Sequence, residues 1–145
     1  MLKRTITYED FDGNQVTDTL EFNLTKTELT EMNLAQEGGL ADFIEQIVHE
    51  EDQKKIYELF KGLVVKAYGK RSADGKRFIK KASDGTPLAD EFVETAAFDA
   101  MMIEMLTSEN AELATEFIKG IIPKDLRAQV EQDQAQANIV PASNK

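Results

Sequence analysis

Few residues in this chain have the types and spacing that catalysis or metal binding requires. The chain contains one histidine, His49, and no cysteine, so it offers no thiol nucleophile and no thiolate metal site. His49 follows an acidic helical segment, where we interpret it as a helix-end residue that interacts with the helix dipole and nearby carboxylates. No glycine-rich phosphate loop and no G-x-S-x-G elbow is present. The sequence therefore predicts neither an enzyme nor a cofactor.

Carboxylates are abundant, but their spacing marks no acid–base pair. The segment Asp10-Phe11-Asp12-Gly13 shares only its first residues with a calcium-binding loop, because the further aspartate and the later bidentate glutamate are missing. We interpret this segment as a turn, and the sequence predicts no metal site.

A basic loop stands out in the otherwise acidic chain. Six of the 17 lysines and arginines lie between Lys70 and Lys81, together with Phe78. The loop is either a solvated hairpin that balances acidic helices, or a positive ridge with Phe78 at its tip that contacts an acidic or helical partner. Nucleic acid is not expected as a partner, because the net charge of the chain is −10 and the ridge is short.

A cluster of methionines is the second candidate surface. Met101, Met102 and Met105 repeat at helical spacing. Such a stripe either fills the core or forms an adaptable apolar groove for partner helices. The residues that we predict to contact a partner are Phe78 and the groove residues Tyr68, Phe98, Met101 and Met105.

The composition is that of a folded, soluble chain. Hydrophobic residues make up 41% and aromatic residues 8% of the 145 residues, which suffices for one domain with a core. The negative charge favours solubility and a partner that is neutral, basic or apolar. No apolar run reaches the length of a membrane span, and residues 1–5 lack the apolar core of a signal peptide, so no membrane association is expected.

Apolar and polar residues alternate on both sides of Asp12-Gly13-Asn14, which predicts a β-hairpin in residues 1–24. Two strands alone are marginally stable, so this hairpin must pack on the helices or pair with another chain. An exposed strand edge there would allow self-association.

Residues 25–68 have the periodicity of three helices. Thr25 and Glu28 have the spacing of a capping box, and this first helix is expected to end at Gly38-Gly39. Asp52 is the predicted N-cap of the third helix, in which Gly62 would allow another backbone to approach closely.

Residues 69–85 form the basic loop, with a short strand at 77–80 between two turns, and residues 86–123 predict three more helices. The expected caps of these helices are Thr86-Pro87, Thr95 and Thr107-Ser108, and the last helix is expected to end at Gly120 and Pro123.

The predicted fold class is α+β and mainly α. It consists of an N-terminal β-hairpin, a compact bundle of five to six short helices and a small hairpin or loop insertion near residues 70–85. Residues 1–123 are expected to form a single globular domain. Residues 124–145 are expected to be a polar tail that is partly helical or disordered.

Four segments follow one another at a spacing that points to a known family. They are Ala67-Tyr68-Gly69, residues 74–80, residues 92–98 and residues 114–123. In this order they resemble the tail assembly chaperones of long-tailed, siphovirus-like bacteriophages, and the resemblance covers roughly residues 56–123.

The resemblance implies a non-enzymatic role in the cytoplasm of the infected cell. Chaperones of this family bind the long, aggregation-prone tape measure protein, keep it soluble and help tail-tube subunits to polymerise around it. The resemblance therefore implies the tape measure protein as the partner, the tail-tube protein as a second candidate partner, and absence from the mature virion.

Two other functions stay open at this point. The net charge also suits an acidic DNA mimic that inhibits a DNA-binding protein, although the cations between Lys70 and Lys81 interrupt such a surface. Alternatively, the chain is a structural virion component, such as a tail-completion or connector subunit.

Overall fold

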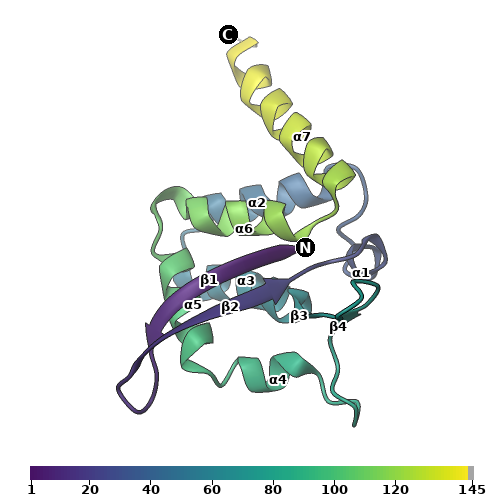
Figure 1. Ribbon diagram of the computed structural model, residues 1–145. Helices are drawn as coiled ribbons and strands as arrows, with labels where there is room; N and C mark the ends of the chain where they lie inside the picture. The colour runs from purple at the N-terminus through teal and green to yellow at the C-terminus, as the bar shows by residue number, and fades with distance from the viewer. Residues whose placement is uncertain (144–145) are drawn as a thin grey trace.

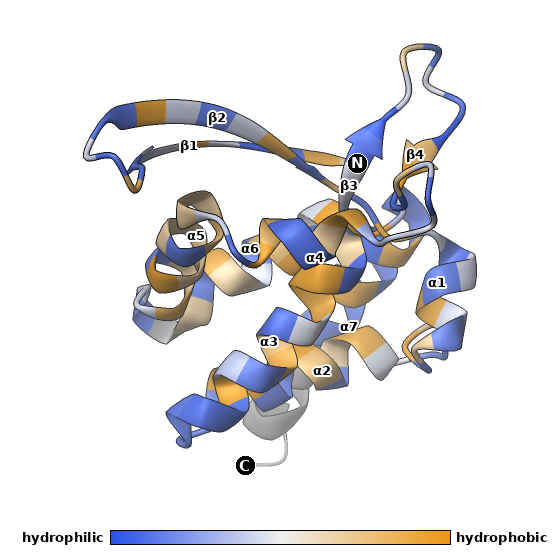
Figure 2. Cartoon of the chain, turned by 90° about the horizontal axis from the view of Figure 1, so that it is seen from below, coloured by the Kyte–Doolittle hydropathy of each residue, from blue (hydrophilic) through white to orange (hydrophobic). Residues whose placement is uncertain are grey.

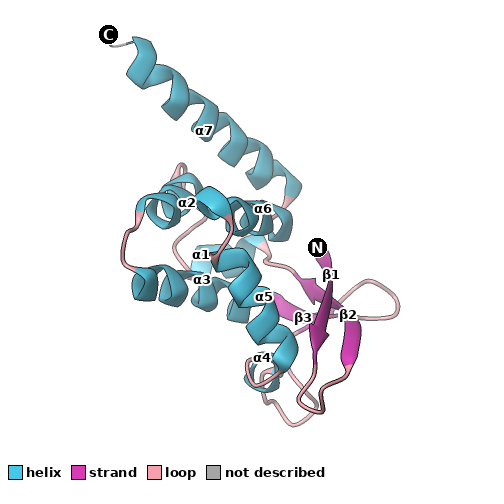
Figure 3. Cartoon of the chain, turned by 90° about the vertical axis from the view of Figure 1, so that its left-hand side faces the viewer, coloured by secondary structure: helices cyan, strands magenta, loops and turns pink. Residues whose placement is uncertain are grey.

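The computed structural model describes residues 1–143, in which helices cover one face of a small antiparallel sheet (Figures 1 and 3). The sheet has four strands in the order β1-β2-β3-β4. Its strands are β1 (Leu2–Glu9), β2 (Gln15–Phe22), β3 (Tyr68–Arg71) and β4 (Phe78–Ile79). The predicted N-terminal hairpin and the short strand inside the basic loop are thus confirmed.

Seven α-helices are present in the described residues, which confirms the predicted class, α+β and mainly α. They are α1 (Lys26–Glu31), α2 (Gly39–His49), α3 (Gln53–Ala67), α4 (Leu88–Phe92), α5 (Ala96–Leu106), α6 (Glu112–Ile121) and α7 (Lys124–Ser143). A short 3₁₀ turn, η1 (Glu109–Ala111), precedes α6.

The β1–β2 hairpin has a buried face and an exposed face, because side chains alternate along a strand. Figure 2 shows this alternation as bands of polar and apolar residues along β2. Ile6, Leu20 and Phe22 are buried against the helices. The hairpin also pairs with β3 of the same chain, through Glu21 opposite Gly69 and Phe22 opposite Tyr68. The support that an isolated hairpin needs therefore comes from within the chain.

Side-chain caps begin three helices where the sequence predicts them. Thr25 and Glu28 make both bonds of the capping box at α1, Asp52 caps α3 and Thr95 caps α5. Each such cap gives a partner to a backbone N–H that the helix itself cannot satisfy.

The end of the first helix differs from the prediction. α1 ends at Glu31 rather than at Gly38, because Asn33 has a φ of 59° and begins a Schellman motif. In that motif the N–H of Leu34 donates to the carbonyl of Leu29 at 2.8 Å. Asparagine tolerates the left-handed conformation, so it can end a helix without a glycine.

Three further boundaries differ. Pro87 is itself the N-cap of α4 and has an extended backbone, so this helix begins at Leu88. Thr107 is the C-cap of α5, and Ser108 is the N-cap of η1 rather than of α6. Gly120 lies inside α6, where an added Cβ would meet the side chain of Leu2 on β1 at 3.0 Å.

A single apolar core lies between the sheet and the helices. Aromatic rings run through it: Phe22 meets Phe117 edge to face with 4.9 Å between ring centroids, and Tyr68 stacks on Phe92 at 3.9 Å. Such pairs stabilise a fold by about 0.5–1.5 kcal/mol beyond the burial of their area. The rings tie β2 to α6 and β3 to α4, and they hold the root of the basic loop in place.

The chain beyond Pro123 continues as α7, which projects away from the body (Figures 1 and 3). Its first turns pack on α2 and α6, where Val130 is buried and Arg127 Nε donates to the Lys119 carbonyl at 2.7 Å. The expected polar tail is thus helical over Lys124–Ser143, and its last two positions, 144–145, lie outside the described residues.

Candidate functional site

The basic loop folds into a short β-hairpin, residues 68–81, which we call the basic hairpin. Its turn is fixed by Asp74, whose Oδ1 accepts from the N–H of Lys76 at 3.0 Å and from the hydroxyl of Ser72 at 2.7 Å. These bonds hold the pKa of the Asp74 carboxyl below its ordinary value. Gly75, at a φ of 74°, completes the turn. The cations on this hairpin are therefore presented from an ordered backbone.

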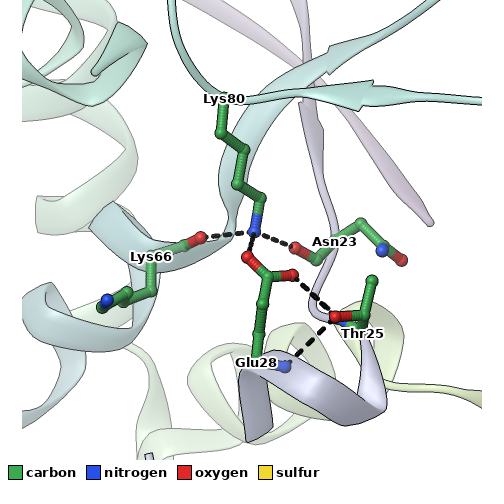
Figure 4. Close-up of polar contacts among 5 residues, drawn as sticks. All are labelled: Asn23, Thr25, Glu28, Lys66 and Lys80. Atoms are coloured by element: carbon green, nitrogen blue, oxygen red, sulfur yellow. Dashed lines mark hydrogen bonds and ion pairs between the residues drawn. The ribbon is translucent and has the colours of Figure 1, made fainter. Parts of the chain in front are cut away.

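Lys80 anchors the basic hairpin to three other elements (Figure 4). Its Nζ donates to the carbonyl of Asn23 at 2.8 Å, to the carbonyl of Lys66 at 2.6 Å and to Glu28 Oε2 at 2.5 Å. Glu28 is also the capping-box residue of α1, where it accepts from Thr25. One ammonium group thus connects the end of β2, the end of α3 and the start of α1.

The electrostatics of this pair follow from its partial burial. Burial lowers the pKa of Lys80, and the hydrogen bond and charge of Glu28 oppose that shift without cancelling it. Burial by itself would raise the pKa of Glu28, but hydrogen bonds from Lys80 and Thr25 outweigh it, and the pKa is lowered. The charged form of Glu28 is therefore favoured, and its carboxylate lies against the Lys80 ammonium group as an ion pair.

Lys80 lines two hollows. The first, which we call the Phe78 hollow, has a volume of about 440 Å³ and is lined by Phe78, Ile79, Arg77, Lys81 and the start of α1. The second, the Tyr68 hollow, has about 430 Å³ and is lined by Tyr68, Val65, Pro87 and Ala89, with charged residues at its rim. Each combines an apolar lining with charges, as binding sites for protein segments commonly do.

Phe78 does not lie at the tip of the basic hairpin, and the expectation from the sequence is wrong on this point. It lies on β4, half-buried, with its ring against Gly69, where an added Cβ would come within 2.6 Å of that ring. Because glycine has no side chain, the ring can cover the neighbouring strand. The tip consists instead of the Asp74-Gly75 turn.

Tyr68 and Phe78 are the two predicted contact residues that border a hollow and keep some exposure. Tyr68 is half-buried against Phe92, and burial raises the pKa of its phenol. Lys80 Nζ lies 5.7 Å from the centroid of the Phe78 ring, within the range of a cation–π contact. The structure thus places each of these two predicted residues in a hollow that Lys80 also lines.

The other three predicted contact residues lie in the core. Phe98 is 6% exposed, and Met101 and Met105 have no exposed surface. The methionine stripe therefore fills the core and does not line an apolar groove. The reason is that these residues lie on the face of α5 that packs on β1, α3 and α6, whereas Asp99, Ile103 and Glu104 lie on its exposed face.

The most exposed large apolar residue among those described is Phe11, which the sequence analysis treated only as part of a turn. It lies at the tip of the β1–β2 hairpin and is 85% exposed, and Ile103 on α5 is 57% exposed. The sequence did contain a signal for this exposure, namely a single aromatic residue between two aspartates in a predicted turn. In a protruding turn, no neighbouring residue can cover such a side chain.

Potential metal-ligating side chains do not gather into a site in the described residues. His49 ends α2, and its Nε2 lies 2.8 Å from Glu45 Oε2, which confirms its interpretation as a helix-end residue. No group of three or more potential metal-ligating side chains comes together in residues 1–143. In the same part of the chain, none of the helices combines the length and the apolar character that crossing a membrane requires.

One comparison with known proteins identifies a family. The model of a family described as phage tail assembly chaperone matches residues 1–144. No curated protein and no solved structure matches the chain. The match takes in the β1–β2 hairpin and α7, which extend beyond the segments on which the sequence resemblance rests. The chain belongs to the phage tail assembly chaperone family.

Proposed function

We propose that the protein binds the tape measure protein, keeps it soluble and assists the polymerisation of the tail tube around it. The family match over residues 1–144 carries this proposal. A tape measure chain exposes apolar helical stripes until the tube encloses it. A protein that covers those stripes for a limited time needs surface contacts and no bond-making chemistry.

The charge of the chain supports this role. With a net charge of −10, bound copies would repel one another and keep a long apolar polypeptide dispersed. The apolar contacts available on the surface are few and separate: Phe11, Tyr57 and Ile103 are exposed, and the Tyr68 and Phe78 hollows are small. Several modest contacts suit a partner that assembly must later displace, because such contacts dissociate readily.

Co-expression with the tape measure protein of the same phage tests the proposal. We expect the tape measure protein to move from the insoluble to the soluble fraction and to co-purify with the chaperone. A tape measure protein that stays insoluble and unbound would rule the proposal out.

A pair of variants locates the contact. Phe78→Ala is expected to lose tape measure binding while keeping most of its stability, because the ring is half-buried on the surface. Met101→Ala is the control: its side chain is fully buried, so it should lower stability by about 2–5 kcal/mol without a specific effect on binding. If Phe78→Ala lowers stability on the same scale, Phe78 belongs to the core.

The same proposal places the protein in the host cytoplasm and outside the finished particle. Mass spectrometry of purified virions checks this, with absence as the expected result. A constant number of copies per particle would favour the alternative, a structural virion component.

A further inference from the structure

The two ends of the sheet carry opposite charges. At one end, the turn between β1 and β2 holds Glu9, Asp10 and Asp12 around Phe11; we call residues 9–14 the hairpin tip. At the other end, the basic hairpin holds six lysines and arginines between positions 70 and 81. Figures 1 and 2 place these two features on opposite sides of the molecule. They cannot meet within one chain, but they can meet between two chains.

The hairpin tip is ordered and apolar at its outermost point. Asp10 Oδ1 accepts from the N–H groups of Asp12 and Asn14, both at 2.9 Å, and Asp10 N–H donates to the Asn14 carbonyl at 2.9 Å. Phe11 is 85% exposed at the end of this turn. Because hydrogen bonds order the backbone of the turn before binding, little backbone entropy is lost when the ring is buried.

The Phe78 hollow has the complementary chemistry. Its volume of about 440 Å³ is large enough for a phenyl ring, and Phe78 and Ile79 give it apolar walls. Arg77 and Lys81 line it and are exposed, and their side chains make no ion pair among the described residues. The one carboxylate in the lining, Glu28, is already paired with Lys80.

We infer that the hairpin tip of one copy docks in the Phe78 hollow of a second copy, with Phe11 between the apolar walls and Asp12 against Arg77 and Lys81. The contact joins two different surfaces, so in a docked pair one copy keeps a free hollow and the other copy keeps a free tip. Copies therefore associate head to tail into rings or open chains rather than into a closed two-fold dimer. This association needs no protein other than a second copy of this chain.

Sedimentation velocity of the full chain, from micromolar to millimolar concentration, tests the inference. We expect the average mass to rise with concentration, as a reversible contact between copies requires. A wild-type chain that stays monomeric over the whole range would overturn the inference.

Two variants remove one half of the contact each. Phe11→Ser removes the docking ring, and the combined change Arg77→Glu and Lys81→Glu reverses the charge of the hollow. Each is expected to weaken self-association by roughly thirtyfold or more, as the loss of a central contact residue does. All three residues are exposed, so the fold should persist, which circular dichroism checks. Tyr57→Ser, at another exposed aromatic residue, is the matched control and should associate like wild type.

Mixing the two defective variants distinguishes this geometry from any symmetric contact. The Phe11→Ser chain keeps an intact hollow and the charge-reversed chain keeps an intact tip, so the mixture should form a one-to-one dimer and stop there. A mixture that stays monomeric, or that forms long assemblies, would refute head-to-tail docking.

Discussion

Lys80 has a structural role that its residue type alone does not indicate. In the sequence it is one of six cations in a loop, whereas in the structure its ammonium group has three acceptors from three elements. If it were absent, the carbonyls of Asn23 and Lys66 would lose this donor, and the carboxylate of Glu28 would keep only its bonds from Thr25.

We therefore predict that Lys80→Met lowers the free energy of unfolding by about 1–3 kcal/mol, the cost of leaving partly buried polar groups unpaired. Urea denaturation of both proteins measures the difference. Lys81→Met is the control, because Lys81 is exposed and its replacement should change stability by no more than about 0.5 kcal/mol. Equal effects of the two changes would refute the anchoring role of Lys80.

The ionisation of Glu28 gives a prediction about pH. Its pKa is lowered in the folded protein, so its carboxylate stabilises the fold above the ordinary value of 4.5, and this contribution is lost as the pH falls through the folded pKa. Glu28→Gln should therefore lose less stability than wild type between pH 7 and pH 3. Urea midpoints at the two pH values measure this loss, and identical losses would show that Glu28 is not a source of acid sensitivity.

At the scale of elements, the pairing of β3 with β4 depends on a glycine. A Cβ at Gly69 would lie 2.6 Å from the Ile79 carbonyl and 2.6 Å from the Phe78 ring. The strands and the ring would have to separate, and the Phe78 hollow would change shape with them.

Gly69→Ala is accordingly expected to lower stability by about 1–3 kcal/mol through overpacking. Gly62→Ala is the matched control on α3, where nothing lies within 4 Å of the new methyl group, and it should raise stability by about 0.5–1 kcal/mol. Thermal unfolding of both variants tests the pair, and opposite signs are the expected result. A stabilising Gly69→Ala would mean that the two strands tolerate separation.

The empty surroundings of Gly62 also correct the expectation that another backbone packs there. A glycine in a helix indicates that a side chain is missing, but it does not say whether another element fills the space.

At the scale of the whole molecule, the net charge connects solubility to the proposed function. If mutual repulsion keeps a chaperone–tape measure complex dispersed, that repulsion should vanish where the chaperone carries no net charge. We predict that the complex precipitates as the pH approaches 4.6, the isoelectric point of the chaperone, and that it redissolves at pH 7. Light scattering during a pH titration measures this, and a complex that stays clear at the isoelectric point would exclude dispersal by charge.

The sequence by itself determined the local elements, because their signals lie within a few neighbouring residues. Alternation gave the hairpin, the Thr25–Glu28 spacing gave a cap, and periodicity gave the helices. It also gave the family, because that resemblance rests on the order of short segments along the chain.

The tertiary structure alone decided which residues are available to a partner. An apolar stripe shows that one face of a helix is covered, but it does not show which element or partner covers it. The sequence therefore allowed Met101 and Met105 to be assigned to a groove. In the structure, β1, α3 and α6 cover both side chains. Phe11 is exposed because no distant segment of the chain packs on it. Lys80 is bound to Glu28 because the fold brings together two residues that are 52 positions apart in sequence. Exposure and pairing depend on contacts between parts of the chain far apart in sequence, and local patterns carry no information about those contacts.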